Sequence, residues 1–223
     1  MNLSITKDET RQKRFLVATE PVLSLDMEDP IEFVEKHGCF DYVKVGHNLA
    51  IKGKAILDVF HNKGYKVILD LKFSDIPSTV ARSIKAWEHP AIIGFTIHAN
   101  AGVESVRAAL DSTEKQIFSV IKLTSIPGRL EEYEDLIIGL ARLGSSFVLP
   151  GNWAIKMRNK IGGKILVPGI RMTQGKDDQK DVVNLWDVVG IADFAVIGRE
   201  VYKAQDPKRK IEEIKERMRL WKE

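Results

Sequence analysis

The sequence contains one cysteine, no long apolar run and no serine- and glycine-rich linker. Cys39 has no partner for an intramolecular disulfide and excludes a cysteine-rich metal site, so we expect it to pack in the core. No apolar run approaches the roughly 20 residues that cross a bilayer, and the polar segment Met1–Arg14 lacks the apolar centre of a signal peptide. We therefore expect a cytoplasmic protein without a membrane segment.

Charge of one sign is not concentrated anywhere in the chain. There are 34 Lys and Arg against 31 Asp and Glu, a formal net charge of +3, and the two signs are interleaved. The densest charged stretch, residues 208–223, carries apolar side chains at helical spacing: Ile211, Ile214, Met218 and Leu220 or Trp221. This pattern predicts an amphipathic helix rather than a basic arm, and we expect no nucleic-acid partner.

Signatures of metal, dinucleotide and acyl-transfer sites are missing as well. The five histidines show no metal-ligand spacing: His37, His47, His61, His89 and His98. Of these, we expect His98 to support a site through a hydrogen bond. Gly162-Gly163 is not part of a G-x-G-x-x-G pattern and indicates a turn. No nucleophile elbow is present either, so we expect no catalytic metal, no dinucleotide loop and no Ser-His-Asp site.

The sequence does have a rhythm in which short apolar runs alternate with helical patterns. The predicted strands are 22–25, 42–45, 66–71, 92–97, 117–123, 146–149, 164–167 and 194–197. The predicted helices are 30–36, 49–62, 77–87, 103–110, 130–143, 153–160, 182–189 and 208–223. Parallel strands covered on both faces read as continuous apolar runs, so the alternation predicts an α/β fold with a parallel sheet.

Eight such units without a linker predict one domain, a (β/α)8 TIM barrel over residues 15–223, behind a polar extension at 1–14. An open, doubly wound sheet is the alternative. The apolar stretch Phe15–Thr19 either covers the bottom of the barrel or extends the first strand. In such a barrel the chemistry lies at the carboxyl ends of the strands, so the polar residues there are the candidates for the site.

The group after the third strand is the most specific of them. Asp70 and Lys72 are two residues apart at a strand end and point to the same side, and Asp75 follows at a helix start. Two carboxylates beside one ammonium favour its protonated form, which suits a proton donor better than a Schiff-base nucleophile. The alternatives are an interior ion pair for Asp70 and Lys72, and an ordinary helix N-cap before Pro77 for Asp75.

Two turns, after the seventh and eighth strands, indicate a phosphate site. Their candidate residues are Pro168, Gly169, Arg171 and Gln174 in the first, and Gly198 and Arg199 in the second. Glycine lets backbone N–H groups approach an anion, an arginine can grip it with two bonds, and this architecture binds phosphate at these loops. For either turn alone, a surface turn with a solvated arginine is the alternative.

Lys44 lies inside the apolar run 42–45. A lysine in a buried strand costs free energy unless a carboxylate pairs with it, so we expect Lys44 to face the barrel mouth near Asp26 and Asp70. A charged residue at a frayed strand edge is the alternative.

Together these residues resemble the orotidine 5′-phosphate decarboxylase family, over nearly the whole chain from Pro21 onward. The family's Asp-x-Lys-x-x-Asp segment and the residues after it are matched by Asp70, Lys72, Asp75, Ile76 and Thr79. The other matching residues are Asp26, Lys44, Ser125, Pro168, Gly169, Arg171, Gln174, Gly198 and Arg199. Two matches stay open. Glu20 competes with Asp26 for the strand-one role, and Arg171 takes part of the role of Gln174 if the loop register differs.

The resemblance implies a cofactor-free enzyme that decarboxylates orotidine 5′-monophosphate to UMP in de novo pyrimidine biosynthesis. It implies that Lys72 protonates C6 and that Asp70 lies beside the departing carboxylate. The implied substrate contacts are Asp26 and Lys44 to the ribose, Ser125 to the pyrimidine, and Gln174 and Arg199 to the phosphate. It also implies a homodimer in which Asp75 and Thr79, four apart on one helix face, reach into the neighbouring subunit's site.

Two alternatives share this barrel. Sugar-phosphate decarboxylases and aldolases of the same superfamily carry a similar Asp-x-Lys-x-x-Asp segment, but offer a glutamate for a metal ion in strand two, where this chain has Lys44. A non-catalytic nucleotide-phosphate-binding barrel has no need of the charges on Asp70, Lys72 and Asp75. Both fit the chain less well than the decarboxylase.

Overall fold

The computed structural model describes residues 17–172 and 183–222. The extension expected at 1–14 and the loop residue Gln174 lie outside these ranges. The strands are β1 (Glu20–Ser24), β2 (Tyr42–Val45), β3 (Lys66–Phe73), β4 (Ile92–His98), β5 (Gln116–Val120), β6 (Ser146–Val148), β7 (Ile165–Arg171), β8 (Val183–Asn184) and β9 (Phe194–Ile197). The α-helices are α2 (Pro30–His37), α3 (Leu49–Lys52), α4 (Ala55–Asn62), α5 (Pro77–Trp87), α6 (Val103–Leu110), α7 (Glu134–Arg142), α8 (Gly151–Met157), α9 (Leu185–Val188), α10 (Arg199–Tyr202) and α11 (Pro207–Lys222). Short 3-10 turns are η1 (Ala99–Ala101) and η2 (Leu130–Glu132).

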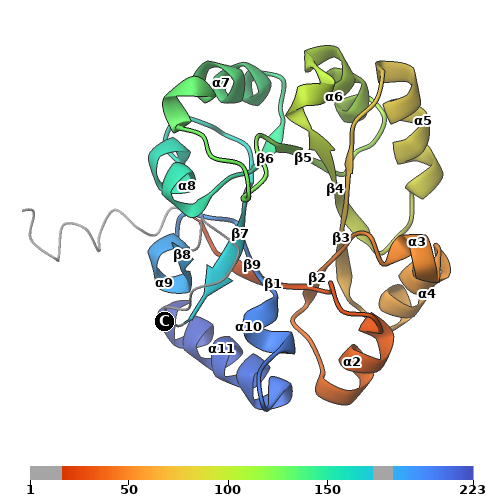
Figure 1. Ribbon diagram of the computed structural model, residues 1–223, viewed down its shortest axis with the longest axis vertical. Coiled ribbons are helices and arrows are strands. Elements are labelled where there is room, and N and C mark those ends of the chain that lie inside the picture. Colours follow the sequence, from red (N-terminus) through yellow and green to blue (C-terminus); the bar gives the residue numbers. More distant parts are fainter. Residues whose placement is uncertain (1–16, 173–182, 223) are drawn as a thin grey trace, which may run out of the picture.

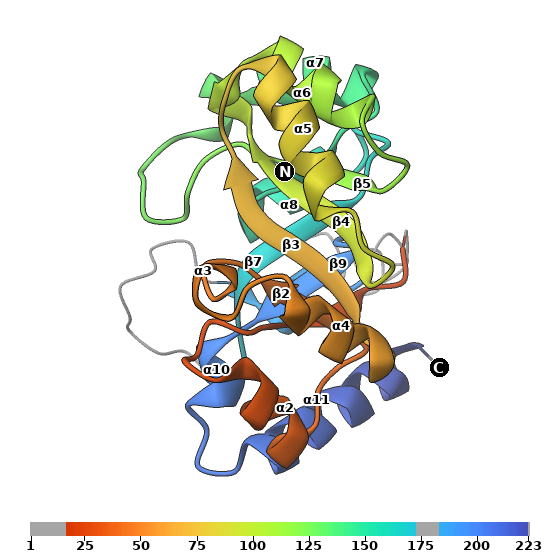
Figure 2. The same cartoon turned by 90° about the vertical axis from the view of Figure 1, so that its right-hand side faces the viewer.

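The strands form one closed, parallel barrel. Hydrogen-bonded neighbours follow the order β6-β5-β4-β3-β2-β1-β9-β7, and pairing of β6 with β7 closes the ring. The short β8 adds to β7. The helices lie around the outside of the strands (Figure 1), with α2 and α11 on one side and α5, α6 and α7 on the other (Figure 2). The (β/α)8 prediction is confirmed, and the open-sheet alternative is wrong.

Alternation along the strands divides the core into two parts. The buried side chains inside the barrel are Val22, Ile68, Phe118, Leu166, Phe194 and Val196. The larger cluster, which includes Leu23, Val43 and Leu69, packs under the helices. Since side chains alternate between the two faces of a strand, the residues two positions beyond the interior ones also point inward, at the carboxyl ends. This parity brings Ser24 and Asp70 to the barrel mouth, and likewise Lys44, because the partly buried Tyr42 packs against the interior cluster.

Most predicted elements are present, and the differences lie at helix starts, at one glycine and at strand ends. The helix predicted over 130–143 begins as the 3-10 turn η2 and continues as α7. Helices α5 and α6 have the predicted bounds. The single helix predicted over 49–62 is split into α3 and α4, because Gly53 adopts a φ of 68° and ends the first. The helix predicted over 182–189 begins only after Asn184, whose side chain accepts the N–H of Trp186 as a helix cap.

The first and last described residues both pack against the barrel: the first next to the amino end of β1, and the last through helix α11 on the outside. The Thr19 hydroxyl contacts the backbone of Gly190 and Ala192 before β1 begins. In α11, Trp221 rather than Leu220 joins the apolar side, since Trp221 stacks on Trp186 while Leu220 is 58% exposed. No helix within the described residues is long and apolar enough to span a bilayer.

Candidate active site

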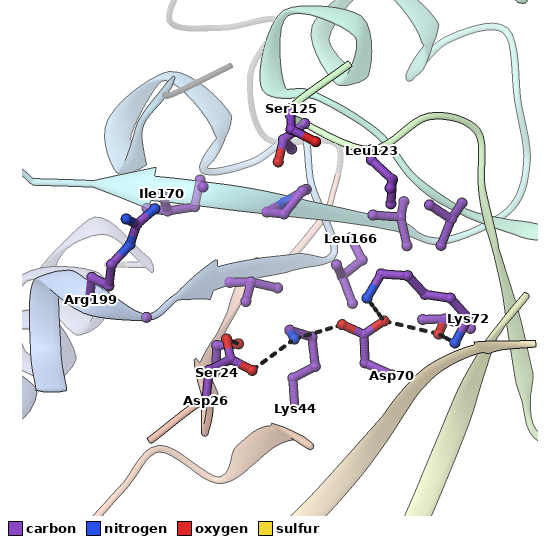
Figure 3. A pocket seen from close by; sticks show the side chains of 18 of the residues that line it. Ser24, Asp26, Lys44, Asp70, Lys72, Leu123, Ser125, Leu166, Ile170 and Arg199 are labelled. Carbon is purple, nitrogen blue, oxygen red and sulfur yellow. Dashed lines mark hydrogen bonds and ion pairs between the residues drawn. The ribbon is translucent and has the colours of Figure 1, made fainter. Parts of the chain in front are cut away.

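A cavity of about 290 Å³ opens at the carboxyl ends of the barrel strands. Figure 3 shows Asp26, Lys44, Asp70 and Lys72 in a row along one side of it, Ser125 on the opposite side and Arg199 at one end. The site residues expected from the sequence that line this cavity are Asp26, Lys44, Asp70, Lys72, Ser125, Pro168, Gly169, Arg171, Gly198 and Arg199. Glu20, the competitor of Asp26, instead borders a hollow at the amino end of β1.

Charges of alternating sign form the row. Lys44 Nζ lies 2.6 Å from Asp70 Oδ2 and 3.8 Å from Asp26 Oδ1. Lys72 Nζ lies 2.9 Å from the other oxygen of Asp70, Oδ1. The side chains of Asp70 and Lys44 are 9% and 12% exposed, whereas that of Lys72 is 32% exposed and lines the cavity. Asp70 is therefore a buried anion between two cations, one buried and one accessible.

Burial and charge act on this pair in opposite directions. Burial alone would raise the pKa of Asp70, but the charges of Lys44 and Lys72 and their hydrogen bonds hold that pKa below its ordinary value. Burial would likewise lower the pKa of Lys44, but Asp70 and Asp26 keep it above its ordinary value. Both groups are therefore charged at neutral pH, and Lys72 faces a permanent carboxylate.

Lys72 itself stands at an irregular point of its strand. The register between β3 and β4 shifts between Leu69 and Phe73, as at a β-bulge, which can re-aim a side chain. Among the described residues Lys72 is the one non-glycine with a positive φ, 49°. Such a conformation costs on the order of 1–3 kcal/mol and persists where surrounding contacts impose it, often at functional sites.

The glycine-bearing segments at the ends of β7 and β9 also line the cavity. The turn predicted after the seventh strand is wrong for Gly169 and Arg171, because β7 continues through a register shift between Val167 and Ile170 and ends at Arg171. At this shift Gly169 has a φ of 73°, in the left-handed region that favours glycine. Gly198 precedes α10, and Arg171 and Arg199 line the cavity with these glycines. Two guanidinium groups in a cavity that glycines also line suit a phosphate-sized anion.

Three expected residues stand outside the cavity lining. Asp75 and Ile76 border a shallow surface groove with Ala101 and Glu104, and Thr79 follows in α5. The N-cap of α5 is Ile76, with no side-chain cap, and Asp75 Oδ1 accepts the N–H of Ile76 at 2.7 Å. The interpretation of Asp75 as the helix cap is therefore wrong. Ile76 is 64% exposed, an unusual position for a large apolar side chain.

Five polar residues without an expected role also line the cavity: Ser24, Thr96, Lys122, Thr124 and Tyr202. Ser24 Oγ donates to Asp26 Oδ2 at 2.6 Å. Lys122, 6% exposed, donates to the carbonyl of Ile126 at 2.8 Å and so ties down the loop that carries Ser125. Lys122, like Lys44, is a lysine inside an apolar run, so the same sequence pattern could have identified it. Ser24 and Thr96 show no such pattern.

Two further expectations concern His98 and metals. Nδ1 of His98 accepts the N–H of Asn100 at 3.3 Å, and burial, then the charge of Lys72, lower the pKa of His98. Within residues 17–172 and 183–222, no group of three or more His, Cys, Asp or Glu side chains is arranged to hold a metal ion. That the protein needs no cofactor stays a prediction.

The chain is similar in sequence and in structure to orotidine 5′-phosphate decarboxylases. The model of the "Orotidine 5'-phosphate decarboxylase / HUMPS family" matches residues 19–214. An orotidine 5′-phosphate decarboxylase of Thermotoga maritima is 62% identical over 200 residues, covering 90% of this chain and 99% of that protein. One of Buchnera aphidicola is 32% identical over 222 residues, covering 90% and 91%. A crystal structure of the Thermotoga maritima decarboxylase matches with a TM-score of 0.83 and 58% identity, covering 89% of this chain and 100% of that one.

Proposed function

The chain belongs to the orotidine 5′-phosphate decarboxylase family, and from this premise we propose that Lys72 donates the proton that replaces the carboxylate at C6. The enzyme is a carboxy-lyase that converts orotidine 5′-monophosphate to UMP in pyrimidine biosynthesis. The observation that carries the proposal is the position of Lys72 Nζ, in the cavity and 2.9 Å from the ionised Asp70. An ammonium group held there is both a charge and a proton source.

The reaction breaks the bond between C6 and the carboxylate carbon. Its electron pair stays on C6, CO₂ leaves, and C6 then takes a proton. The positive charge of Lys72 stabilises the developing negative charge at C6, and its Nζ supplies the proton. Asp70 lies beside the substrate carboxylate, where like-charge repulsion raises the energy of the bound ground state. We assign the larger share of the rate enhancement to the stabilisation by Lys72.

The remaining cavity residues bind the parts of the substrate that do not react. Asp26 and Lys44 hold the ribose hydroxyls, and Ser125 binds the pyrimidine. The phosphate residues are Pro168, Gly169, Arg171, Gln174, Gly198 and Arg199. Support for this division comes from Arg171 and Arg199, which both line the cavity, and from the position of Arg199 at one end of it (Figure 3). Binding energy gained at the phosphate can then lower the barrier at C6.

We also propose a homodimer with shared sites. Asp75, Ile76 and Thr79 would contact the substrate bound to the neighbouring subunit. Support comes from the position of Asp75 outside the cavity of its own chain and from the exposed Ile76 beside it. An exposed apolar side chain next to an acidic one fits a surface that a second copy covers.

Finally, we propose that the enzyme acts in the cytoplasm without metal or organic cofactor. Lys44 supports the second point, because its charge at strand two would repel a divalent cation.

The test is spectrophotometric. After exhaustive chelation, the wild-type protein should consume orotidine 5′-monophosphate. Lys72→Ala should abolish turnover while UMP still binds, since losing one positioned charge at the reacting carbon costs on the order of several kcal/mol in the barrier. Lys72→Arg is the matched control, because it keeps the charge but does not release its proton, and it should stay far below wild type.

Two outcomes would contradict the proposal. Near-normal turnover of Lys72→Ala would leave Lys72 a structural partner of Asp70. Activity that vanishes on chelation and returns with a divalent ion would favour the metal-dependent sugar-phosphate chemistry.

A further inference from the structure

Thr96 joins the two charged residues at the centre of the site through a single hydroxyl. Its side chain is 1% exposed and lies on β4 facing the cavity. Oγ1 accepts the backbone N–H of Lys72 at 2.9 Å and donates its own proton to Asp70 Oδ1 at 3.0 Å. The same Asp70 oxygen accepts from Lys72 Nζ at 2.9 Å. The three groups form a closed ring of hydrogen bonds between β3 and β4.

The ring sits where the strand ladder is broken. The pairing of β3 with β4 shifts between Leu69 and Phe73, and Lys72 adopts a left-handed backbone. A buried N–H without a partner is costly, and at this bulge the Thr96 hydroxyl supplies the acceptor for Lys72. Accepting that bond leaves the hydroxyl proton for Asp70, because a threonine hydroxyl has one proton to donate.

We infer that Thr96 is a positioning residue for the decarboxylation, which fixes the backbone of Lys72 and the carboxylate of Asp70 relative to each other. The inference rests on the proposed roles of Lys72 and Asp70. Thr96 acts through these two residues. Its loss should therefore lower kcat and leave substrate binding at the ribose and phosphate nearly unchanged.

Thr96→Val removes the hydroxyl with little change of shape, and Thr96→Ser keeps it. Thr19→Val is the matched control. Thr19 is 3% exposed, and its hydroxyl also accepts one backbone N–H, from Gly190, and donates to one carbonyl, that of Ala192. It lies at the other end of the barrel.

Thr96→Val should lose about 10- to 100-fold in kcat, as expected for small misplacements of a reacting group, with KM within about threefold. Thr96→Ser should stay near wild type.

Equal losses of kcat in Thr96→Val and Thr19→Val, or no loss in Thr96→Val, would overturn the inference. So would a Thr96→Ser variant as impaired as Thr96→Val. If Thr96→Val does not fold, Thr96→Ala carries the same comparison.

A second measurement needs no activity. The amide of Lys72 should exchange its hydrogen faster in Thr96→Val than in wild type by NMR, while the amide of Gly190 should not change. Unchanged exchange at Lys72 would overturn the inference. If the wild-type protein failed to consume orotidine 5′-monophosphate, the proposed function would fall, and this exchange experiment would still decide whether Thr96 holds Lys72.

Discussion

Replacing Lys44 with methionine tests whether the row of charges is built as the structure indicates. Methionine keeps the unbranched shape and removes the charge. The substitution removes the shortest ion pair in the row of charges that lines the cavity, in which Lys44 Nζ and Asp70 Oδ2 are 2.6 Å apart. Both side chains are nearly buried. Of the two ammonium groups paired with Asp70 in the described part of the chain, Lys72 then remains. The partner variant is Asp70→Asn, which keeps shape and removes the anion.

The magnitude follows from distance and burial. With charge centres about 4 Å apart and an effective dielectric constant of about 20, the attraction is about 4 kcal/mol. Removing one partner of a buried pair typically costs about 3–5 kcal/mol, because the other charge stays buried. We expect Lys44→Met to lower the free energy of unfolding by about 3 kcal/mol at pH 7. The double variant should cost little more than either single one, so the coupling energy should be about 2–3 kcal/mol.

Urea unfolding measures these free energies without substrate, so the proposed role of Lys44 at the ribose does not affect the result.

The pH dependence of the free energy of unfolding gives a second check. The pKa of Asp70 is lowered in the folded protein. Its ionisation therefore stabilises the fold fully above the unfolded-state pKa of about 3.9, and that contribution is lost as pH falls through the folded pKa. In Lys44→Met the folded pKa of Asp70 rises, so less of the contribution should remain to be lost below about pH 4.

A coupling energy below about 0.5 kcal/mol would refute this reasoning. It would mean that water screens Lys44 and Asp70 as it screens a surface pair. The alternating charges would then be an incidental arrangement rather than a stabilised network.

The other predictions concern the phosphate and the dimer. Arg199→Ala should weaken UMP binding strongly and uridine binding little by calorimetry, because only UMP carries the anion that Arg199 grips; equal weakening would place its effect on the fold or the base. Mixing inactive Lys72→Ala and Asp75→Asn chains should restore roughly a quarter of wild-type activity after random subunit exchange, since half the dimers are mixed and half their sites are whole. No recovery after verified exchange would place Asp75 in its own subunit's site.

The fold was predictable because its signal is repeated. Parallel strands buried on both faces appear as apolar runs. Pro77 marks the start of α5, and Gly102 stands directly before α6. What the sequence did not show are local breaks. The amphipathic pattern of 49–62 continues across Gly53, so only the positive φ at that glycine reveals two helices. The bulge that carries β7 on to Arg171 leaves no trace in composition either.

Site residues could be predicted from the sequence where their side chains are costly to bury. Site residues that are not costly to bury could not be identified in this way. Lys44 and Asp70 stand out in apolar runs because a buried charge must be paired. Thr96 does not stand out, because threonine is common in strands and its value lies in two bonds to a neighbouring strand. Lys122 was detectable by the same argument as Lys44, but its bond to the Ile126 carbonyl depends on how the loop after β5 folds back.

The spacing of Asp70, Lys72 and Asp75 in the sequence suggests that the three charges lie in one place. In the structure the backbone places them at two different locations. Asp70 and Lys72 share the cavity. At Lys72 the chain takes a left-handed turn, and three residues later Asp75 borders an outer groove beside Ile76. The position of Asp75 outside the cavity of its own chain is what supports the proposed site shared between subunits. The left-handed backbone at Lys72 lies between the two carboxylates, where the chain leaves the cavity. The exchange of Lys72→Ala and Asp75→Asn subunits tests the shared site directly.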